Sequence, residues 1–178
     1  MMKNIVLSVL FVLGLTTVNG QEKDKFRAGL DLGYVFADVG GGMLFDIEPK
    51  YNITDNSNVG IRFGVAASSS DLDTNVDANL SILGTYDYYF SNGQSSTAPF
   101  LGGGLGYYIL GEVDNSVNLG EQFGAIIRGG VEFGKFRLAL EYNILPKTDL
   151  EIGESVKNSY FGASIGFYVG GGKWKKEN

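Results

Sequence analysis

The residues best placed to do chemistry are charged side chains that alternate with apolar ones over residues 122–145. Within this stretch, two segments of alternating residues are joined only by the glycine and lysine at 134–135. A two-residue connection that opens with glycine is typical of a type II′ β-hairpin, and it fixes the pairing register. In that register each basic residue faces an acidic one, which predicts two cross-strand ion pairs. The predicted pairs are Arg128 with Glu141, and Glu132 with Arg137.

The sequence offers no complete set of catalytic residues. The chain contains no histidine, so serines such as Ser68, Ser81 and Ser164 have no obvious base. The carboxylates of Asp46 and Glu48 could exchange protons in principle, but pairing with basic residues explains them more simply. We therefore predict that the protein is not an enzyme.

One acidic run resembles the first ligands of a calcium loop: Asp71, Asp73, Asn75 and Asp77. However, Val76 stands where such a loop needs glycine, and Ile82 where it needs a bidentate glutamate. The glycine-rich stretch 102–106 precedes no helix whose N-terminus could hold a phosphate. The sequence predicts neither a metal site nor a cofactor.

Residues 1–20 have the pattern of a secretory signal peptide, with Lys3, an apolar run over 5–15 and a small residue at Gly20. The run is shorter than the roughly 20 residues that cross a bilayer as a helix. We predict cleavage after Gly20, leaving residues 21–178 as one domain with a short polar C-terminal tail. The formal net charge of −6 argues against a nucleic-acid partner, and the absence of cysteine excludes disulfides.

Alternation of apolar and polar residues predicts eight strands with connections rich in turn-forming residues. The strands cover residues 26–36, 45–51, 61–68, 77–90, 99–110, 122–133, 136–145 and 160–169. Because proline cannot donate to a ladder, we expect a bulge or a strand end near Pro49. No apolar run after the leader approaches the length of a transmembrane helix, so entry into a membrane would require strands.

The two faces of these strands differ, and this fits two kinds of barrel. A soluble barrel would turn the apolar face inward, whereas a membrane barrel would turn it toward lipid and fill its lumen with the charged face. Aromatic residues favour the membrane barrel, because they cluster near both strand ends as interfacial girdles do. One predicted girdle holds Phe26, Tyr88, Phe90, Phe100, Phe133, Phe136 and Phe167, and the other Tyr34, Phe36, Phe45, Tyr107, Phe123, Tyr142 and Phe161.

The lumen of such a barrel is predicted to hold a network of charges of both signs. Its members are Arg27, Asp31, Asp46, Glu48, Lys50, Arg62, Asp77, Asp87, Arg128, Glu132, Arg137 and Glu141. Pairing among them is close to obligatory, because an isolated charge in a confined site is costly. We expect the paired side chains to plug the barrel.

The leader, the eight alternating strands and the closing hairpin with Glu141 and Tyr142 resemble the small outer-membrane β-barrel family, the OmpA/OmpX-like class. The resemblance covers the whole mature chain and implies an all-β, eight-stranded antiparallel up-and-down transmembrane barrel. It further implies a place in the cell outer membrane and contact with its lipid and lipopolysaccharide. Insertion by the barrel-assembly machinery and a monomeric state are also implied. We expect the tight turns to face the periplasm and the acidic links to face outward.

Together these patterns favour a non-catalytic protein with a structural or surface-interaction role in the envelope. Two alternatives stay open from the residues alone. One is a conduit for small solutes or hydrophobic molecules, and the other is a soluble, secreted, ligand-binding β-barrel.

Overall fold

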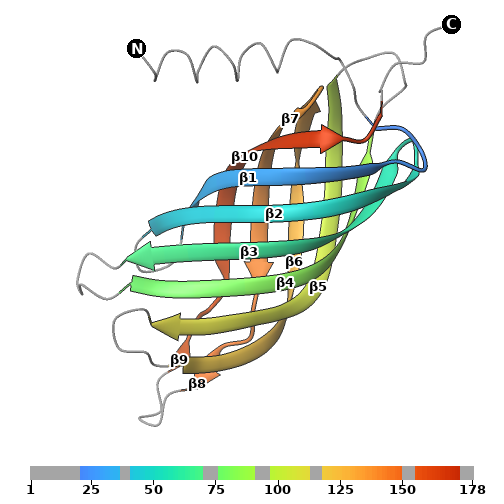
Figure 1. Ribbon diagram of the computed structural model, residues 1–178. Helices are drawn as coiled ribbons and strands as arrows, with labels where there is room; N and C mark the ends of the chain where they lie inside the picture. The colour runs from blue at the N-terminus through green and yellow to red at the C-terminus, as the bar shows by residue number, and fades with distance from the viewer. Residues whose placement is uncertain are drawn as a thin grey trace, which may run out of the picture.

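Eight long antiparallel strands close into a single barrel in the computed structural model (Figure 1). The structure describes residues 21–36, 41–69, 76–90, 97–112, 118–149 and 155–172. The barrel strands are β1 (Phe26–Phe36), β2 (Gly41–Thr54), β3 (Ser57–Ser69), β4 (Val76–Tyr89), β5 (Thr97–Glu112), β6 (Asn118–Phe133), β7 (Phe136–Ile144) and β10 (Tyr160–Gly170). Each pairs with its neighbours along the barrel, and β10 pairs with β1 to close it. The predicted up-and-down fold is therefore confirmed.

The connection between β7 and β10 contains a feature that the sequence did not predict. Two short strands, β8 (Thr148–Asp149) and β9 (Ser155–Val156), form a separate two-stranded sheet there. This small sheet lies at the end of the barrel opposite the start of β1 and the end of β10 (Figure 1). We call that end the link side. The end with the tight β2–β3 and β6–β7 turns is the turn side.

Strand β7 shows how the sequence sets the two faces of the sheet. Its residues alternate strictly between exposed and buried. Phe136, Leu138 and Leu140 are exposed, whereas Arg137 and Glu141 are almost completely buried. Side chains of a strand point alternately to the two faces, and an eight-stranded barrel is narrow enough for inward side chains to fill it. The charges therefore face inward and the apolar residues outward, so a soluble barrel with the apolar face inside is wrong.

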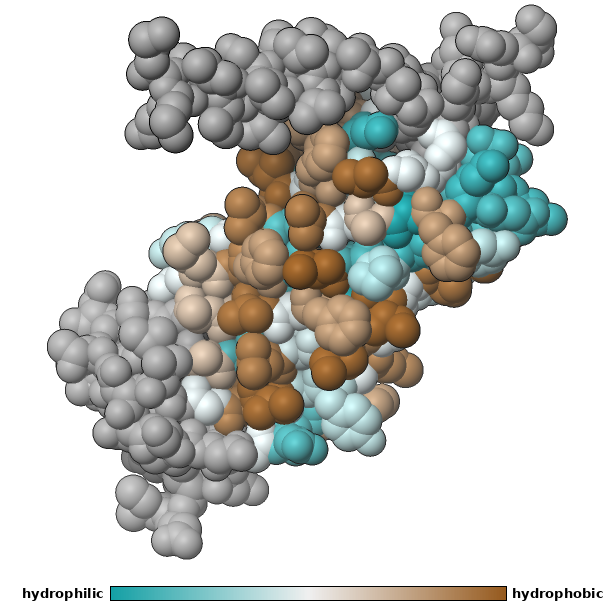
Figure 2. Space-filling model, viewed as in Figure 1, coloured by the Kyte–Doolittle hydropathy of each residue, from teal (hydrophilic) through white to brown (hydrophobic). Residues whose placement is uncertain are grey.

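The outer surface is correspondingly apolar. Figure 2 shows hydrophobic side chains gathered across the middle of the visible face. Aromatic rings pack against one another near both ends: the centroids of Phe136 and Phe167 are 5.4 Å apart on the turn side, and those of Tyr107 and Phe123 are 5.4 Å apart on the link side. Phe100 is an exception among the predicted girdle residues, because it is only 3% exposed and points into the lumen.

The hairpin of β6 and β7 has the predicted register. Phe133 pairs with Phe136 directly beside the turn. Gly134 adopts a φ of 59°, a left-handed value that glycine reaches without the steric penalty of a Cβ atom. The short turn thus places the charged residues of both strands on the inner face.

Pro49 leaves β2 intact. It pairs with Ala28 of β1, and the ladder with β3 keeps one register on either side of it. The register shift in that ladder falls between Asn52 and Thr54 instead, close to the β2–β3 turn. At the proline itself the β2–β3 ladder has no pair for Glu48 or Pro49, so the missing donor interrupts the pairing without a bulge or a strand end.

Glycines on the inner wall let large side chains lie flat against it. A Cβ atom on Gly29 would sit 2.4 Å from the ring of Tyr168, and one on Gly102 would sit 1.9 Å from the Asp87 carboxylate. Both contacts are far closer than atoms can approach. These glycines consequently make room for the lumen side chains described below. Among the described residues, no helix has the length and apolar character needed to cross a membrane.

Candidate functional site in the barrel lumen

The charged residues predicted for the lumen form its most unusual feature. Eleven of the twelve are buried inside the barrel: Arg27, Asp31, Asp46, Glu48, Lys50, Arg62, Asp87, Arg128, Glu132, Arg137 and Glu141. The twelfth, Asp77, belongs to β4, and its side chain lies outside the described residues, as do Asp71, Asp73 and Asn75. The buried set comes from β1, β2, β3, β4, β6 and β7.

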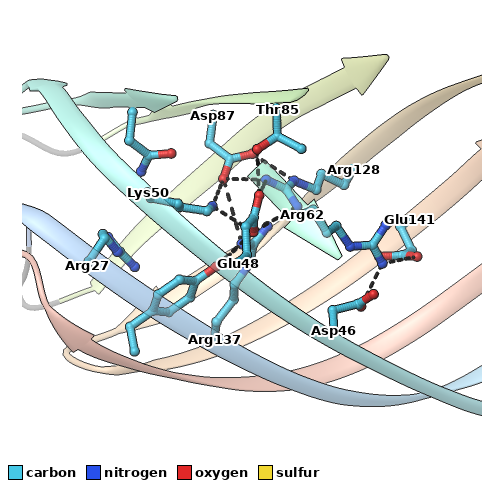
Figure 3. Close-up of polar contacts among 12 residues, drawn as sticks. Arg27, Asp46, Glu48, Lys50, Arg62, Thr85, Asp87, Arg128, Arg137 and Glu141 are labelled. Atoms are coloured by element: carbon cyan, nitrogen blue, oxygen red, sulfur yellow. Dashed lines mark hydrogen bonds and ion pairs between the residues drawn. The ribbon is translucent and has the colours of Figure 1, made fainter. Parts of the chain in front are cut away.

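A central cluster joins the carboxylates of Glu48 and Asp87 to three cations (Figure 3). Arg137 is the most distant of the three, with Nη1 3.7 Å from an oxygen of each carboxylate. Arg128 Nη2 lies 2.6 Å from Glu48 Oε1, and Arg128 Nε lies 2.8 Å from Asp87 Oδ1. Lys50 Nζ lies 3.1 Å from Glu48 Oε2 and also pairs with Asp87. The hydroxyl of Thr85 donates to Glu48 Oε1 at 2.6 Å. Each carboxylate in this central cluster therefore accepts from several donors, as buried charges require.

A second cluster is centred on Arg62. Its Nη2 lies 2.6 Å from Asp46 Oδ2 and 2.8 Å from Glu141 Oε1. Asn143 Nδ2 donates to the same oxygen of Glu141 at 2.9 Å, and the hydroxyl of Tyr108 donates to Asn143 Oδ1 at 2.8 Å. Arg62 stands on β3 and Glu141 on β7, so this pair spans the lumen.

Toward the turn side, aromatic rings hold two cations. Arg27 pairs with Glu132 at 2.7 Å, and its guanidinium carbon lies 3.9 Å from the centroid of the Tyr168 ring. The guanidinium carbon of Arg137 lies 4.0 Å from the centroid of the Phe100 ring, and its Nη1 donates to the Tyr168 hydroxyl. Such stacking stabilises a cation that has left water.

The two predicted cross-strand ion pairs are wrong, although their register is right. Arg128 does stand opposite Glu141, yet it pairs across the lumen with Glu48 of β2 and Asp87 of β4. Glu132 likewise pairs with Arg27 of β1 rather than with Arg137 opposite it. Long side chains in a narrow barrel converge toward its axis, so carboxylates from distant strands come within reach. Register alone predicts contacts only near the wall.

Apolar side chains fill the link-side half of the lumen, and they were not among the lumen residues predicted from the sequence. Their cluster comprises Val35, Leu44, Ala66, Leu83, Tyr108, Leu110, Ile126, Leu145 and Tyr160. Leu83 and Ile126 are 0% and 1% exposed. The signal was present in the strand alternation, because Leu83 lies two residues from inward-facing Thr85, and Ile126 two residues from inward-facing Arg128. We call this set the apolar layer.

Some buried polar atoms have no hydrogen-bond partner within the described residues. Asp31 and Asp46 stand opposite each other on β1 and β2, and the Oδ1 atom of each is such an atom. Nε and Nη2 of Arg137 are further examples. Polar surroundings of this kind suit bound water. In the part of the chain that the structure describes, no group of three or more acidic, histidine or cysteine side chains is arranged to hold a metal ion.

The outer wall carries a shallow apolar groove of about 730 Å³ across β6, β7, β10 and β1. It forms because Gly129 and Ala163 flank Leu140 in the register and leave space on either side of it. The groove opens on the apolar outer face. It therefore belongs to the surface that lipid would cover, and not to the lumen.

An apolar exterior, a charged interior and closure by antiparallel strands are the features of a transmembrane β-barrel, and the fold is similar to that of small outer-membrane barrels. Solved structures support this assignment of the fold. Neisserial surface protein A has a TM-score of 0.63 at 17% identity, with 82% of this chain and 95% of that chain covered. The N-terminal barrel domain of Pseudomonas aeruginosa OprF has a TM-score of 0.53 at 18% identity, covering 84% and 100%. The P. aeruginosa outer membrane protein OprG has a TM-score of 0.53 at 13% identity, covering 84% and 98%. No family model and no curated protein matches the chain.

Proposed function

We propose that the protein is a non-catalytic, integral outer-membrane barrel with a closed lumen and a structural or surface-interaction role in the envelope. The observation that carries this proposal is the filling of the lumen. The largest fully buried side chains include Arg62, Arg137, Tyr89, Tyr108 and Tyr168, all of which point inward. A barrel whose interior is occupied in this way can serve as a rigid anchor in the membrane.

The surroundings that we propose for the barrel rest on the character of its surface. Its apolar band suits contact with outer-membrane lipid and lipopolysaccharide, and the barrel-assembly machinery would insert it. Closed on itself, the barrel leaves no unpaired edge strand that would require a second copy, so we propose a monomer. The negative net charge disfavours a nucleic-acid partner.

Fractionation tests the location, and labelling tests the orientation. The mature protein should separate with the outer membrane and should migrate differently in gels before and after boiling. A thiol probe added outside intact cells should label a cysteine placed at Asp149 and should miss one placed at Lys135. Labelling of Lys135→Cys alone would invert the proposed orientation, and recovery of the protein in the aqueous fraction would reject the membrane barrel.

A conduit for small solutes is the second candidate, and one observation favours it. The observation is the set of buried polar atoms without described partners in the charged half, which supports hydration of that half. The apolar layer stands in the way of a continuous water path. Vesicle swelling with small sugars distinguishes the two: a closed barrel should leave the swelling rate at that of empty vesicles, whereas a conduit should raise it.

A further inference from the structure

The seam where β10 meets β1 differs from every other strand contact of the barrel (Figure 1). Each of the other neighbouring pairs is joined by a connection of the chain, whereas β1 and β10 are the first and last barrel strands. A ladder between strands far apart in the sequence forms only after the chain between them has been ordered. The seam therefore lacks the local tether that a connection supplies elsewhere.

Asn52, near the end of β2, contacts both sides of this seam. Its amide donates to the carbonyl of Lys25 at 3.0 Å, and its carbonyl accepts from the amide of Asp24 at 2.9 Å, so its backbone is bonded to the chain just before β1. Its side chain reaches past β1, where Nδ2 donates to the carbonyl of Gly171 at 3.0 Å. Gly171 is the residue that follows β10. One residue of β2 is thus bonded to the chain on each side of the seam.

Three further hydrogen bonds complete the junction. The amide of Gly171 donates to the carbonyl of Phe26 at 2.9 Å, and the amide of Glu22 donates to the carbonyl of Gly171 at 2.6 Å. Asn52 Nδ2 also donates to the carbonyl of Glu22 at 2.8 Å. The Gly171 carbonyl therefore accepts from a backbone amide and a side-chain amide at once. We call Glu22, Phe26, Asn52 and Gly171 the seam clasp.

The turn that brings the end of β10 to the seam clasp requires glycine. Gly170, Gly171 and Gly172 have φ values of 84°, 89° and 82°, which residues with a Cβ atom rarely adopt. A Cβ atom on Gly170 would lie 2.5 Å from the carbonyl oxygen of Phe26, and one on Gly172 would lie 2.2 Å from Cβ of Glu22. The three consecutive glycines thus satisfy both the backbone conformation and the close approach.

We propose that the seam clasp is a latch that holds β10 against β1 at the turn side, where no connection of the chain joins the two strands. The inference goes beyond the proposed role in the envelope, because it concerns how the barrel stays closed. The seam clasp needs only residues from Glu22 onward, which the predicted cleavage after Gly20 retains. When the side-chain donor of Asn52 is lost, the seam opens more often while the other ladders keep their stability.

Hydrogen exchange of the mature barrel in detergent micelles, followed peptide by peptide, tests the latch. Asn52→Ala should make amides at the turn-side ends of β1 and β10 exchange about tenfold faster, because it removes two hydrogen bonds, and should leave the β6–β7 hairpin unchanged. Tyr51→Phe is the matched control. It removes an exposed hydrogen bond to Asp24 that does not reach β10, so exchange at the seam should stay at the wild-type rate.

Three results of that experiment would overturn the latch. They are unchanged exchange at the seam in Asn52→Ala, an equal acceleration of the β6–β7 hairpin, and an equal acceleration of the seam in Tyr51→Phe. Exchange in micelles does not depend on where the barrel lies in the cell. Failure of the latch is therefore distinguishable from failure of the proposed function.

A covalent bond across the seam supplies a second test. Ala28 and Val169 are partners in the seam ladder, so cysteines placed at both positions can form a disulfide. With that disulfide closed, Asn52→Ala should exchange at the wild-type rate, and reduction should restore the faster exchange. Faster exchange that persists with the disulfide closed would overturn the latch. If Asn52→Ala alone fails to fold, the closed disulfide should restore folding, and failure to restore it would also overturn the latch.

Discussion

Inward-facing side chains fill both halves of the lumen, but the side chains of the two halves differ in kind. In the charged half, Arg62 and Arg128 reach carboxylates on other strands, including Glu141 across the lumen from Arg62, through short, directed contacts. On the link side, the apolar layer fills the space with Leu83, Ile126 and their neighbours. In the charged half every ion-pair partner must be present, because a buried charge left without its partner lowers the stability more than a lost apolar contact does. In the apolar half, packing requires only side chains whose volume and shape fill the space.

Removal of Arg62 from the charged half should give the largest loss of stability. Arg62→Ala leaves both Asp46 and Glu141 without their cation and should lower the free energy of unfolding by about 3–5 kcal/mol. Urea unfolding in lipid vesicles measures this change.

The double variant of Arg62 and Glu141 supplies the control. Arg62→Met with Glu141→Gln should recover part of the loss, since fewer charges are left unpaired. Because Arg128 pairs elsewhere, Glu141→Ala combined with Arg128→Ala should show no such recovery. Recovery with Arg128 and none with Arg62 would contradict the ion pairing described.

A cavity in the apolar layer should give the next largest loss of stability. Leu83→Ala removes a fully buried side chain from the lumen and should cost about 2–5 kcal/mol, whereas Leu80→Ala on the outer face of the same strand should cost less. The same urea titration compares the two variants. Equal costs would mean that the inner face of β4 is no better packed than its lipid-facing side.

An arginine on the outer face should show how strongly the two faces differ. Arginine is accommodated inside at Arg62, Arg128 and Arg137, but Leu140→Arg should cost about 2–4 kcal/mol if mid-strand Leu140 faces lipid. The yield of folded, heat-shifted protein in vesicles reports the effect, with Leu140→Phe as the control. Full folding of Leu140→Arg would place that face in water.

The smallest expected effect is the loss of one donor from the central cluster. Thr85→Val keeps the shape of the side chain and removes the hydrogen bond to Glu48, which should cost about 1.5–3 kcal/mol. Thr54→Val, whose hydroxyl lies at the β2–β3 turn and contacts Ser57, is a control with a weaker neutral bond. If Thr54→Val cost more stability than Thr85→Val, the loss of a hydrogen bond in the charged half would not be the more destabilising of the two.

Much of this architecture could be predicted from alternation and turn chemistry. The hairpin around Gly134 fixed its own register, because a two-residue turn leaves one solution. The partners of Arg128 and Glu132 could not be predicted, since their contacts cross the lumen and depend on the closed shape of the whole barrel. Phe100 was misassigned because its aromatic character outweighed its place in the alternation, two residues from inward-facing Gly102.

Conductance across a planar bilayer tests the closed lumen most directly. The wild-type barrel should give no steady channels, and a variant with both Leu83→Gly and Ile126→Gly should give them, because it removes two side chains of the apolar layer and leaves the charged half in place. Leu80→Gly with Ile82→Gly on the outer face serves as the matched control and should stay silent. Steady channels from the wild-type protein, unchanged by loss of the apolar layer, would contradict the closed barrel.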